Sequence, residues 1–209
     1  MPDLHVVDHP VIQTKLTELR DFAAGHRVFR SLLNEIAMLM AYEVTRDFPT
    51  RPRVVRTPLE QVTGTELARP VTLVPILRAG LGMSDGVLRV LPEARVGHLG
   101  VQRNEDTLRP EDYYRKLPPD VAETEVLLID PMLATGGSAV AAATWLKEAG
   151  VPGGSIRFLC LVAAPEGVDR LHAAHPDVPI FTAAVDRCLN DVGYILPGLG
   201  DAGDRVFGT

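Results

Sequence analysis

The segment most suited to chemistry is an apolar run that ends in one carboxylate and continues into glycines. It reads VLLIDPMLATGGS, with Asp130 where the apolar part ends. Gly136 and Gly137 let the backbone approach a bound group closely. A helix that begins after them would offer unpaired N–H groups and a partial positive charge, and Thr135 and Ser138 add hydroxyl donors. These residue types in this order predict a phosphate-binding loop beside a carboxylate.

Other interpretations of this loop are weaker. It lacks the lysine of the G-x-x-x-x-G-K-[ST] nucleoside-triphosphate loop, and it lacks the G-x-G-x-x-G of dinucleotide-binding folds. An ordinary strand–turn–helix connection could also use Gly136 and Gly137 for its turn alone. The acid at the end of the run and the two hydroxyls favour a phosphate ligand.

Two arginines occupy comparable positions. Arg78 follows the apolar run 71–77, and Arg103 follows the run 94–101. The planar guanidinium group of arginine binds phosphate through two donors at once. The chain holds 18 Arg and 3 Lys, and genome base composition is the better account of the 16 arginines other than Arg78 and Arg103.

The elements that would position these residues alternate between strands and helices. Short apolar runs predict strands at 71–77, 94–101, 125–130, 156–164 and 178–185, and helical patterns cover 138–149 and 165–175. This alternation indicates parallel βαβ units in an α/β fold, whose ligands bind beyond the carboxyl ends of the strands. Arg78, Arg103, residues 130–138 and the glycine-rich tail near Gly198 all fall at those ends.

The first third of the chain has a different pattern. Apolar spacing predicts helices at 10–24, with Asp8 as its cap, and at 26–45. Four prolines between residues 49 and 70 indicate short edge strands and turns. We expect a single domain of N-terminal helices (1–48), a core (about 70–190) and a C-terminal segment (190–209).

Composition excludes several classes of protein. The 209 residues are 46% hydrophobic and 23% charged, with net charge −6, which argues against disorder and against nucleic-acid or membrane binding. No apolar stretch reaches the ~18 residues of a membrane span, and the first residues do not resemble a signal peptide. Cys160 and Cys188 cannot build a disulfide scaffold. We expect a soluble cytoplasmic protein.

Four motifs together resemble the uracil phosphoribosyltransferase family, a branch of the type I phosphoribosyltransferases. They are PILRAGLGM, DPMLATGGS, LVAAPEG and GYILPGLGDAGDRVFGT, and the likeness extends over essentially the whole chain. It implies a mostly parallel twisted sheet flanked by helices, with a small C-terminal hood. It also implies transfer of phosphoribose from phosphoribosyl diphosphate (PRPP) to N1 of uracil, giving UMP and diphosphate.

The resemblance assigns roles residue by residue. Asp130, Arg78 and Arg103 would be catalytic. The uracil site would be formed by Ile195, Gly200, Asp201 and Ala202. Mg²⁺ would be held mainly by PRPP oxygens rather than by a set of protein ligands. The PRPP site would comprise Arg78, Arg103, Asp130, Pro131, Met132, Leu133, Ala134, Thr135, Gly136, Gly137, Ser138 and Asp201.

One position departs from the wider superfamily. Many type I members have two adjacent acids at this strand end, and here the second position is Pro131. The uracil branch shows the same change. Asp130 alone must therefore serve the ribose, and a mechanism that needs a pair of carboxylates is put in doubt.

Two further features are expected around the site. The polar segment 104–119 is interpreted as a flap over PRPP, with Tyr113, Tyr114 and Lys116 as covering residues, and an exposed hairpin without a role is the alternative. The turn at 78–80 is expected to contain a strained or non-proline cis peptide, as related folds do.

Competing functions stay open at this point. One is a regulator that keeps the fold and binds nucleotide or RNA without catalysis, and another is a phosphoribosyltransferase for a different base. The GLGDAGD tail favours uracil over purines. The family resemblance also suggests a homodimer or homotetramer and leaves a GTP effector open.

Overall fold

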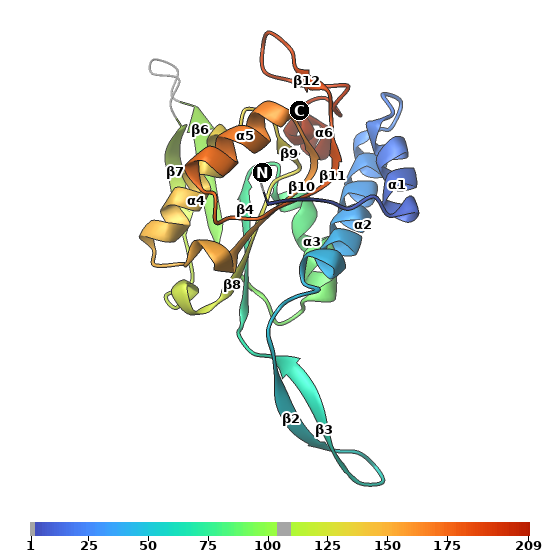
Figure 1. Ribbon diagram of the computed structural model, residues 1–209. Coiled ribbons are helices and arrows are strands. Elements are labelled where there is room, and N and C mark those ends of the chain that lie inside the picture. The colour runs from blue at the N-terminus through green and yellow to red at the C-terminus, as the bar shows by residue number, and fades with distance from the viewer. Residues whose placement is uncertain (1–2, 104–109) are drawn as a thin grey trace.

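A twisted central sheet organises the computed structural model, which describes residues 3–103 and 110–209 (Figure 1). Its strand order is β1–β11–β10–β8–β4–β6–β7, with β5 beside β4 and β9 beside β10. All of these pairings are parallel except β6 with β7. The strands are β1 (Leu4–Val6), β4 (Val71–Leu77), β5 (Arg95–Val96), β6 (His98–Arg103), β7 (Pro110–Lys116), β8 (Glu125–Ile129), β9 (Met132–Leu133), β10 (Ile156–Ala163) and β11 (Ile180–Val185).

Helices cover both faces of this sheet. One face carries α1 (Pro10–Arg20), α2 (His26–Val44) and α3 (Leu81–Val90), with the short α6 (Ala202–Phe207) against α2 (Figure 1). The other face carries α4 (Gly137–Glu148) and α5 (Pro165–Ala174). Single 3₁₀ turns at Val121–Glu123 and Gly153–Ser155 precede β8 and β10.

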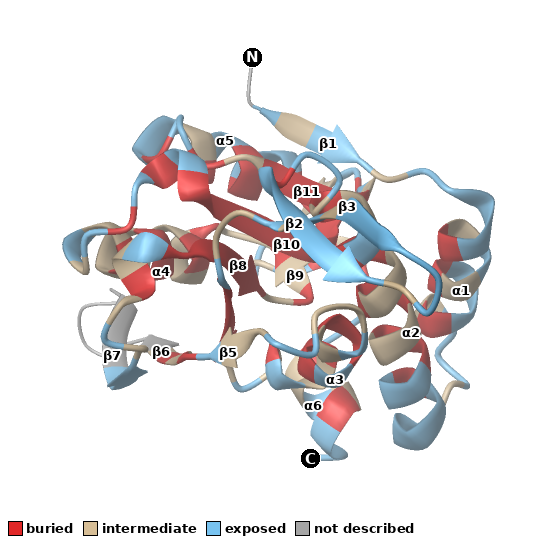
Figure 2. Ribbon diagram, turned by 90° about the horizontal axis from the view of Figure 1, so that it is seen from below, coloured by how far each residue is buried: buried red, intermediate tan, exposed pale blue. Residues whose placement is uncertain are grey.

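Alternate residues of the central strands serve the two faces. In β8, Leu127 and Ile129 pack with the core under α1, α2 and α3. Val126 and Leu128 of the same strand pack with the core under α4 and α5. All five residues of β8 are buried (Figure 2), which explains why residues 126–129 appear in the sequence as one apolar run after the charged Glu125. The predicted α/β sheet is confirmed.

Several predicted boundaries were wrong. Helix α1 ends at Arg20 rather than at residue 24, because Asp21 adopts an extended ψ of 127°. Its cap is His9, whose Nδ1 accepts the Val11 N–H at 3.2 Å, and not Asp8. The expected strand 94–101 is divided at Gly97 into β5 and β6.

The proline-rich segment 49–70 forms one long hairpin rather than several short edge strands. Strand β2 (Thr50–Arg56) pairs antiparallel with β3 (Gln61–Leu67). The hairpin projects from the body of the molecule (Figure 1), and every residue of β2 is exposed (Figure 2). Pro52 is tolerated because this sheet has only two strands, so a missing N–H can face outward.

Helix α3, strand β1 and helix α6 have no counterpart among the predicted elements. Helix α3 is dense in glycine and lies close to α2, where a Cβ on Gly86 would come within 2.1 Å of the Asn34 carbonyl oxygen. Glycine disfavours helices, so the sequence did not predict this one. The close crossing of α2 and α3 nevertheless requires glycine at this position. Among the described helices, none is long and apolar enough to cross a membrane.

Candidate active site

The order of strands reverses between β4 and β8, and the candidate site lies at this edge of the sheet. From β4 the chain passes through α3 to β5 and β6 on one side, whereas β8 pairs with the other side of β4. In a parallel sheet, such a switch point opens a ligand crevice outside the carboxyl ends of the strands. Arg78 directly follows β4, and Asp130 directly follows β8.

Asp130 carries a carboxyl group that is half-buried. Its backbone N–H donates to the Leu159 carbonyl at 3.1 Å, which continues the pairing of β8 with β10. Burial raises the pKa of Asp130 to about 7, opposed in part by a hydrogen bond from the Met132 N–H. Near neutral pH the group therefore exchanges between an acceptor-only carboxylate and a neutral acid. Hydroxyl donors on a ligand would favour the carboxylate.

The loop after Asp130 ends in a helix whose first N–H groups are available. Gly136 has a φ of 75°, and α4 begins at the next residue without a capping hydrogen bond from any described side chain. Free N–H groups and the helix dipole at such an N-terminus attract phosphate. Thr135 and Ser138 flank these groups and are partly exposed. The role of residues 130–138 in binding phosphate stays a prediction, which this helix start favours.

Not every residue in that range can offer its side chain. Leu133 is 1% exposed and packs in the core under α4 and α5. Its carbonyl accepts the Ala164 N–H at 2.9 Å, and the Pro131 carbonyl accepts the Leu161 N–H at 3.0 Å. Pro131 is also buried. These two residues hold the loop on β10, so any PRPP contact they make must come from the main chain.

The turn that carries Arg78 is packed against the strand that carries Asp130. Its Leu77–Arg78 peptide is cis, at the place where the sequence predicts a cis non-proline bond. A Cβ on Gly80 would lie 2.6 Å from the Ile129 carbonyl oxygen. Only a glycine there lets the turn approach the residue before Asp130. The Arg78 side chain is exposed, and its guanidinium lies 5.8 Å from the centre of the Phe207 ring.

The C-terminal segment is the part of the chain expected to form the hood, and we use that name for it. It contains the antiparallel pair β12 (Cys188–Leu189) and β13 (Ile195–Leu196), followed by the loop 197–201 and α6. We call residues 195–202 the base loop, because it holds the four residues assigned to uracil. Ile195 is 4% exposed and Ala202 is fully buried, so these two could meet a ligand only through backbone groups.

Glycines also fit the base loop to its surroundings. Gly198 and Gly200 have φ values of 61° and 76°. Asp201 begins α6, and its carboxylate accepts the Asp204 N–H at 3.0 Å. In the turn between β12 and β13, a Cβ on Gly193 would lie 3.4 Å from the Thr135 side chain. The hood and the phosphate loop are therefore neighbours.

Some residues at the site escaped the sequence analysis. Arg20 bonds to Asp186 and to the Gly198 carbonyl, and Arg205 bonds to the Leu199 carbonyl. The assignment of all arginines except Arg78 and Arg103 to base composition was therefore wrong for these two. Arg20 ends a helix far from any motif, so no local signal could have found it. Gly167 belongs to the LVAAPEG motif, but the sequence did not predict its contact with the phosphate loop. A Cβ there would lie 2.4 Å from the Ala134 carbonyl oxygen.

Arg103 is the last residue of strand β6, and the Arg103 backbone pairs with that of Pro110 in β7. Residues 104–109 of the expected flap lie outside the described residues, whereas 110–116 form β7. Tyr113 and Tyr114 are each 48% exposed, and a Cβ on Gly100 would lie 2.7 Å from the Tyr113 ring. Tyr113 thus packs over β6. The roles of Arg103 and of the flap stay predictions.

Metal-binding side chains are not gathered anywhere in the described residues, where no group of three or more His, Cys, Asp and Glu is placed to hold an ion. Among the residues assigned to the candidate site, the carboxylates are those of Asp130 and Asp201. Mg²⁺ commonly binds through one or two carboxylates together with substrate phosphates. This donor set fits a cation that is held mainly by diphosphate oxygens.

Comparison with solved structures defines the class of protein. A protein from Aquifex aeolicus has a TM-score of 0.92 and 37% identity, covering 99% of this chain and 98% of that one. A purine phosphoribosyltransferase from Pyrococcus horikoshii has a TM-score of 0.53 at 15% identity, covering 75% and 84% of the two chains, which shows a common fold. The fold is that of a type I phosphoribosyltransferase.

Sequence comparison narrows the class. The family model for uracil phosphoribosyltransferase matches residues 6–209. Uracil phosphoribosyltransferases from Desulfitobacterium hafniense, Enterococcus faecalis and Staphylococcus aureus are 57%, 55% and 54% identical to the chain, each over the full length of both proteins. The chain belongs to the uracil phosphoribosyltransferase family. It is a glycosyltransferase of the pentosyl-transferring class.

Proposed function

We propose that the chain forms UMP and diphosphate from uracil and PRPP at the edge where β4 and β8 end. The observation that carries this proposal is the convergence of three segments. Asp130 with its phosphate loop, the Arg78 turn and the hood that carries the base loop meet there through the close approaches of Gly80 to Ile129 and of Gly193 to Thr135. Family membership supplies the reaction and its place in pyrimidine salvage.

In the proposed reaction, the bond from ribose C1′ to the diphosphate oxygen breaks and a bond from C1′ to uracil N1 forms. Diphosphate leaves with the electron pair, and the N1 proton is released. The transition state resembles an oxocarbenium ion, so positioning and charge stabilisation account for most of the catalysis. Asp130 would accept hydrogen bonds from the ribose hydroxyls and place a negative charge near the developing cation. Arg78 and Arg103 would neutralise the departing diphosphate.

The phosphate loop would hold the 5′-phosphate of PRPP. Its donors are the N–H groups at the start of α4 and the hydroxyls of Thr135 and Ser138. Two hydrogen bonds hold the loop in place. The Leu133 carbonyl accepts the Ala164 N–H, and the Thr135 carbonyl accepts from the Arg170 guanidinium at 3.2 Å. A loop held in this way presents its donors without rearrangement when phosphate arrives.

Uracil would be recognised by main-chain groups of the base loop. The base offers two carbonyl acceptors and an N3–H donor, and backbone N–H and C=O groups can match that pattern. The burial of Ile195 and Ala202 favours this mode, since their side chains point into the core. Asp201 would face PRPP from the same loop. Mg²⁺ would arrive with PRPP and supply charge neutralisation at the diphosphate, where Asp130 and Asp201 are the available carboxylates.

The flap 104–119 is proposed to close over PRPP and exclude water, which would otherwise hydrolyse the cationic centre. A cytoplasmic location remains a prediction from composition, and the family resemblance leaves a GTP effector open. Arg51, Arg53 and Arg56 form a small basic cluster on β2 that could take an effector nucleotide. The charge of this cluster is partly neutralised, because Arg51 and Arg53 contact Glu66 at 2.8 and 3.2 Å. Adding GTP to the assay below tests for an effector.

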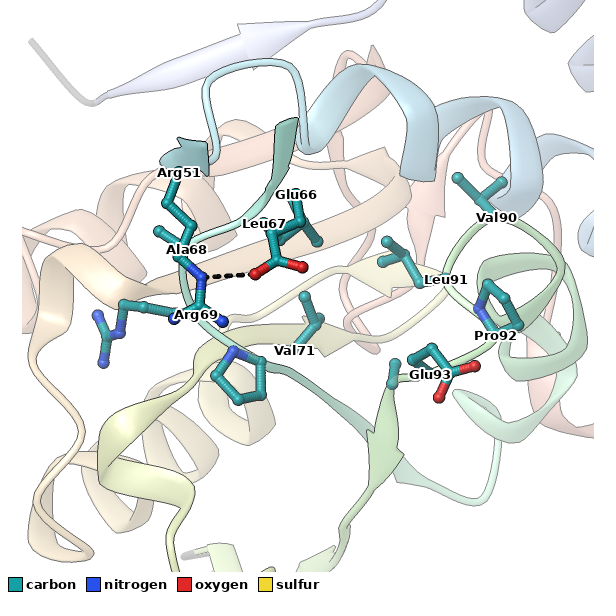
Figure 3. Close-up of a pocket in the computed structure, with 12 residues that line it drawn as sticks. Arg51, Glu66, Leu67, Ala68, Arg69, Val71, Val90, Leu91, Pro92 and Glu93 are labelled. Atoms are coloured by element: carbon teal, nitrogen blue, oxygen red, sulfur yellow. Dashed lines mark hydrogen bonds and ion pairs between the residues drawn. The ribbon is translucent and has the colours of Figure 1, made fainter. Parts of the chain in front are cut away.

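We further propose that copies of the chain assemble as a homodimer or homotetramer through the β2–β3 hairpin. Val55 and Val62 form a cross-strand pair on this hairpin and are 38% and 46% exposed. At its base lies a cleft of about 600 Å³ (Figure 3). Apolar side chains dominate that cleft: Leu67, Val71, Val90, Leu91, Pro92 and Ala94. Exposed apolar surface on a projecting element of this kind typically marks an interface.

Light scattering during size-exclusion chromatography tests the assembly. We expect wild type to elute as a dimer or tetramer and the double variant V55E/V62E as a monomer. Thr63→Glu is the matched control, because Thr63 is exposed on the opposite face of the same hairpin. A monomeric wild type, or a double variant with the wild-type mass, would refute the proposal.

The activity itself is tested by measuring UMP and diphosphate release from PRPP and Mg²⁺. Uracil, cytosine, hypoxanthine and adenine are compared as acceptors at equal concentration. We expect one diphosphate per UMP with uracil and little product with the other bases. Turnover of a purine above that of uracil would overturn the assignment of the base. Binding of PRPP without any product would favour a regulator.

A further inference from the structure

One buried ion pair binds both backbone groups of a single residue in the base loop. Arg20 donates through Nη1 to Asp186 Oδ2 and through Nη2 to Asp186 Oδ1, each at 2.7 Å. The same Nη1 donates to the Gly198 carbonyl oxygen at 2.7 Å. The Gly198 N–H donates in turn to Asp186 Oδ2 at 2.9 Å. The three residues form a closed ring of hydrogen bonds, which we call the Gly198 clamp.

The clamp is shielded from water. The Asp186 side chain is 6% exposed and that of Arg20 is 22% exposed, and Gly198 is buried. Charge-assisted hydrogen bonds are stronger than neutral ones, and a low local dielectric strengthens them further. Losing one member would leave the others buried without a partner, which is costly.

The clamp joins three parts of the chain that are distant in sequence. Arg20 is the last residue of α1. Asp186 directly follows β11, and its N–H donates to the Ala163 carbonyl of β10 at 2.8 Å. Gly198 lies in the centre of the base loop. Hydrogen bonds therefore connect the base loop to the end of β11 and to the end of α1.

The backbone conformation at Gly198 also requires glycine. Its φ is 61°, and a Cβ there would lie 2.2 Å from the Ile195 carbonyl oxygen. The next carbonyl is held in a similar way, because Arg205 donates to the Leu199 oxygen at 2.9 Å and to the Asp21 oxygen at 2.7 Å. Two successive carbonyls of the base loop are thus anchored beside the end of α1.

We propose that Arg20 and Asp186 are positioning residues that set the place of the base loop and so determine affinity for the acceptor base. This inference rests on the proposed function, in which the main chain of residues 195 and 200–202 reads uracil. Neither side chain needs to touch substrate, since both act through Gly198. Recognition by backbone groups depends on where the backbone lies, and a small displacement weakens several hydrogen bonds together.

The test is a comparison of KM for uracil with KM for PRPP in Arg20 variants. We expect Arg20→Ala to raise KM for uracil roughly 10- to 100-fold, the effect of losing charge-assisted hydrogen bonds, while KM for PRPP changes less than about 2-fold. Arg20→Lys keeps the charge but cannot serve both Asp186 oxygens and the Gly198 carbonyl together. It should therefore show an intermediate KM for uracil.

Arg95→Ala is the matched control. Arg95 also donates to both oxygens of one aspartate, Asp120, at 2.6 and 2.7 Å, but it lies at β5, at the opposite end of β4 from Arg78. Both KM values should stay at wild type in this variant. Thermal unfolding of all variants shows whether a kinetic change merely follows a loss of folded protein.

Two results would overturn the proposal. One is a KM for uracil that stays within 2-fold of wild type in folded Arg20→Lys and Asp186→Asn variants. The other is an equal rise in both KM values, which would indicate general loosening of the fold. If Arg20→Ala does not fold, the Lys and Asn variants decide the question. Failure of the proposed function would appear differently, as absence of UMP formation by wild type itself.

Discussion

Gly80 lies against the carbonyl of Ile129, so close that a Cβ on Gly80 would be 2.6 Å from that oxygen. Gly80 belongs to the Arg78 turn and Ile129 is the residue before Asp130. This contact sets the distance between the segment expected to bind diphosphate and the carboxyl expected to bind ribose. The contact is possible only because Gly80 has no Cβ atom.

Gly80→Ala should therefore damage PRPP binding and stability together. The added Cβ would also meet the Ile76 backbone at 2.7 and 2.8 Å, and backbone atoms cannot rotate away. We expect a loss of about 1–3 kcal/mol in the free energy of unfolding, as for other overpacked sites. Urea unfolding measures this, and initial rates give KM for PRPP. Gly154→Ala is the control, because nothing lies within 4 Å of a Cβ there. Equal effects at both positions would contradict the argument.

Asp130→Asn should abolish most activity while leaving the protein folded. The amide cannot supply the negative charge, and we expect kcat/KM to fall at least about 100-fold, as when an electrostatic contact to the transition state is lost. UMP release at pH 8 is the measurement, with circular dichroism to monitor folding. Turnover close to wild type would remove the role assigned to Asp130.

The same variant should be more stable than wild type above pH 7. The pKa of Asp130 is raised to about 7 by burial, so between about pH 4 and pH 7 the unfolded chain releases a proton that the folded chain retains. The free energy of unfolding of wild type therefore falls across this range and then levels off. By linkage the penalty at pH 8 is roughly 2–4 kcal/mol, and Asn avoids it.

Thermal unfolding of wild type and Asp130→Asn from pH 5 to pH 8 measures this difference. The two curves should converge toward the acid end and separate as the pH rises. If the stabilities of the two proteins differed by the same amount at every pH, burial of the Asp130 carboxylate would not carry the expected free-energy penalty.

Activity should depend on pH through the same group. The carboxylate form of Asp130 accepts hydrogen bonds from ribose hydroxyls, so kcat/KM for PRPP should rise with pH up to about 7 and then become constant. Initial rates at low PRPP concentration between pH 5.5 and pH 8.5 test this. Since the phosphates of PRPP also titrate, Asp130→Asn is the reference. If its residual activity follows the same rise, another group is responsible.

Arg78→Ala should weaken the contact with PRPP more than that with uracil. The side chain is exposed and lies over the Phe207 ring, so its loss should cost little stability. We expect KM for PRPP to rise roughly 10- to 100-fold, typical of a lost phosphate contact. Titration of both substrates measures the change. Identical curves for variant and wild type would refute the role of Arg78.

The sequence alone was enough to predict the sheet, and it also supplied the hypotheses of a phosphate loop and of a site at the strand ends. These features are local in sequence: residues 126–129 of β8 form one apolar run, and Asp130 and Gly136 follow within seven residues. The family resemblance supplied the reaction for the same reason, since each of its motifs is contiguous. Boundaries failed where a single backbone angle ended an element, as at Asp21.

What the tertiary structure decided was how distant segments meet. No pattern around Arg20 or Asp186 indicates that they bind Gly198, because 166 and 12 residues separate Asp186 from Arg20 and Gly198 along the chain. The same holds for the fit of Gly80 to Ile129, which is visible only once both backbones are placed. The chemistry of each loop follows from the residue types within that loop. The relative position of the loops depends on packing between elements that are far apart in sequence.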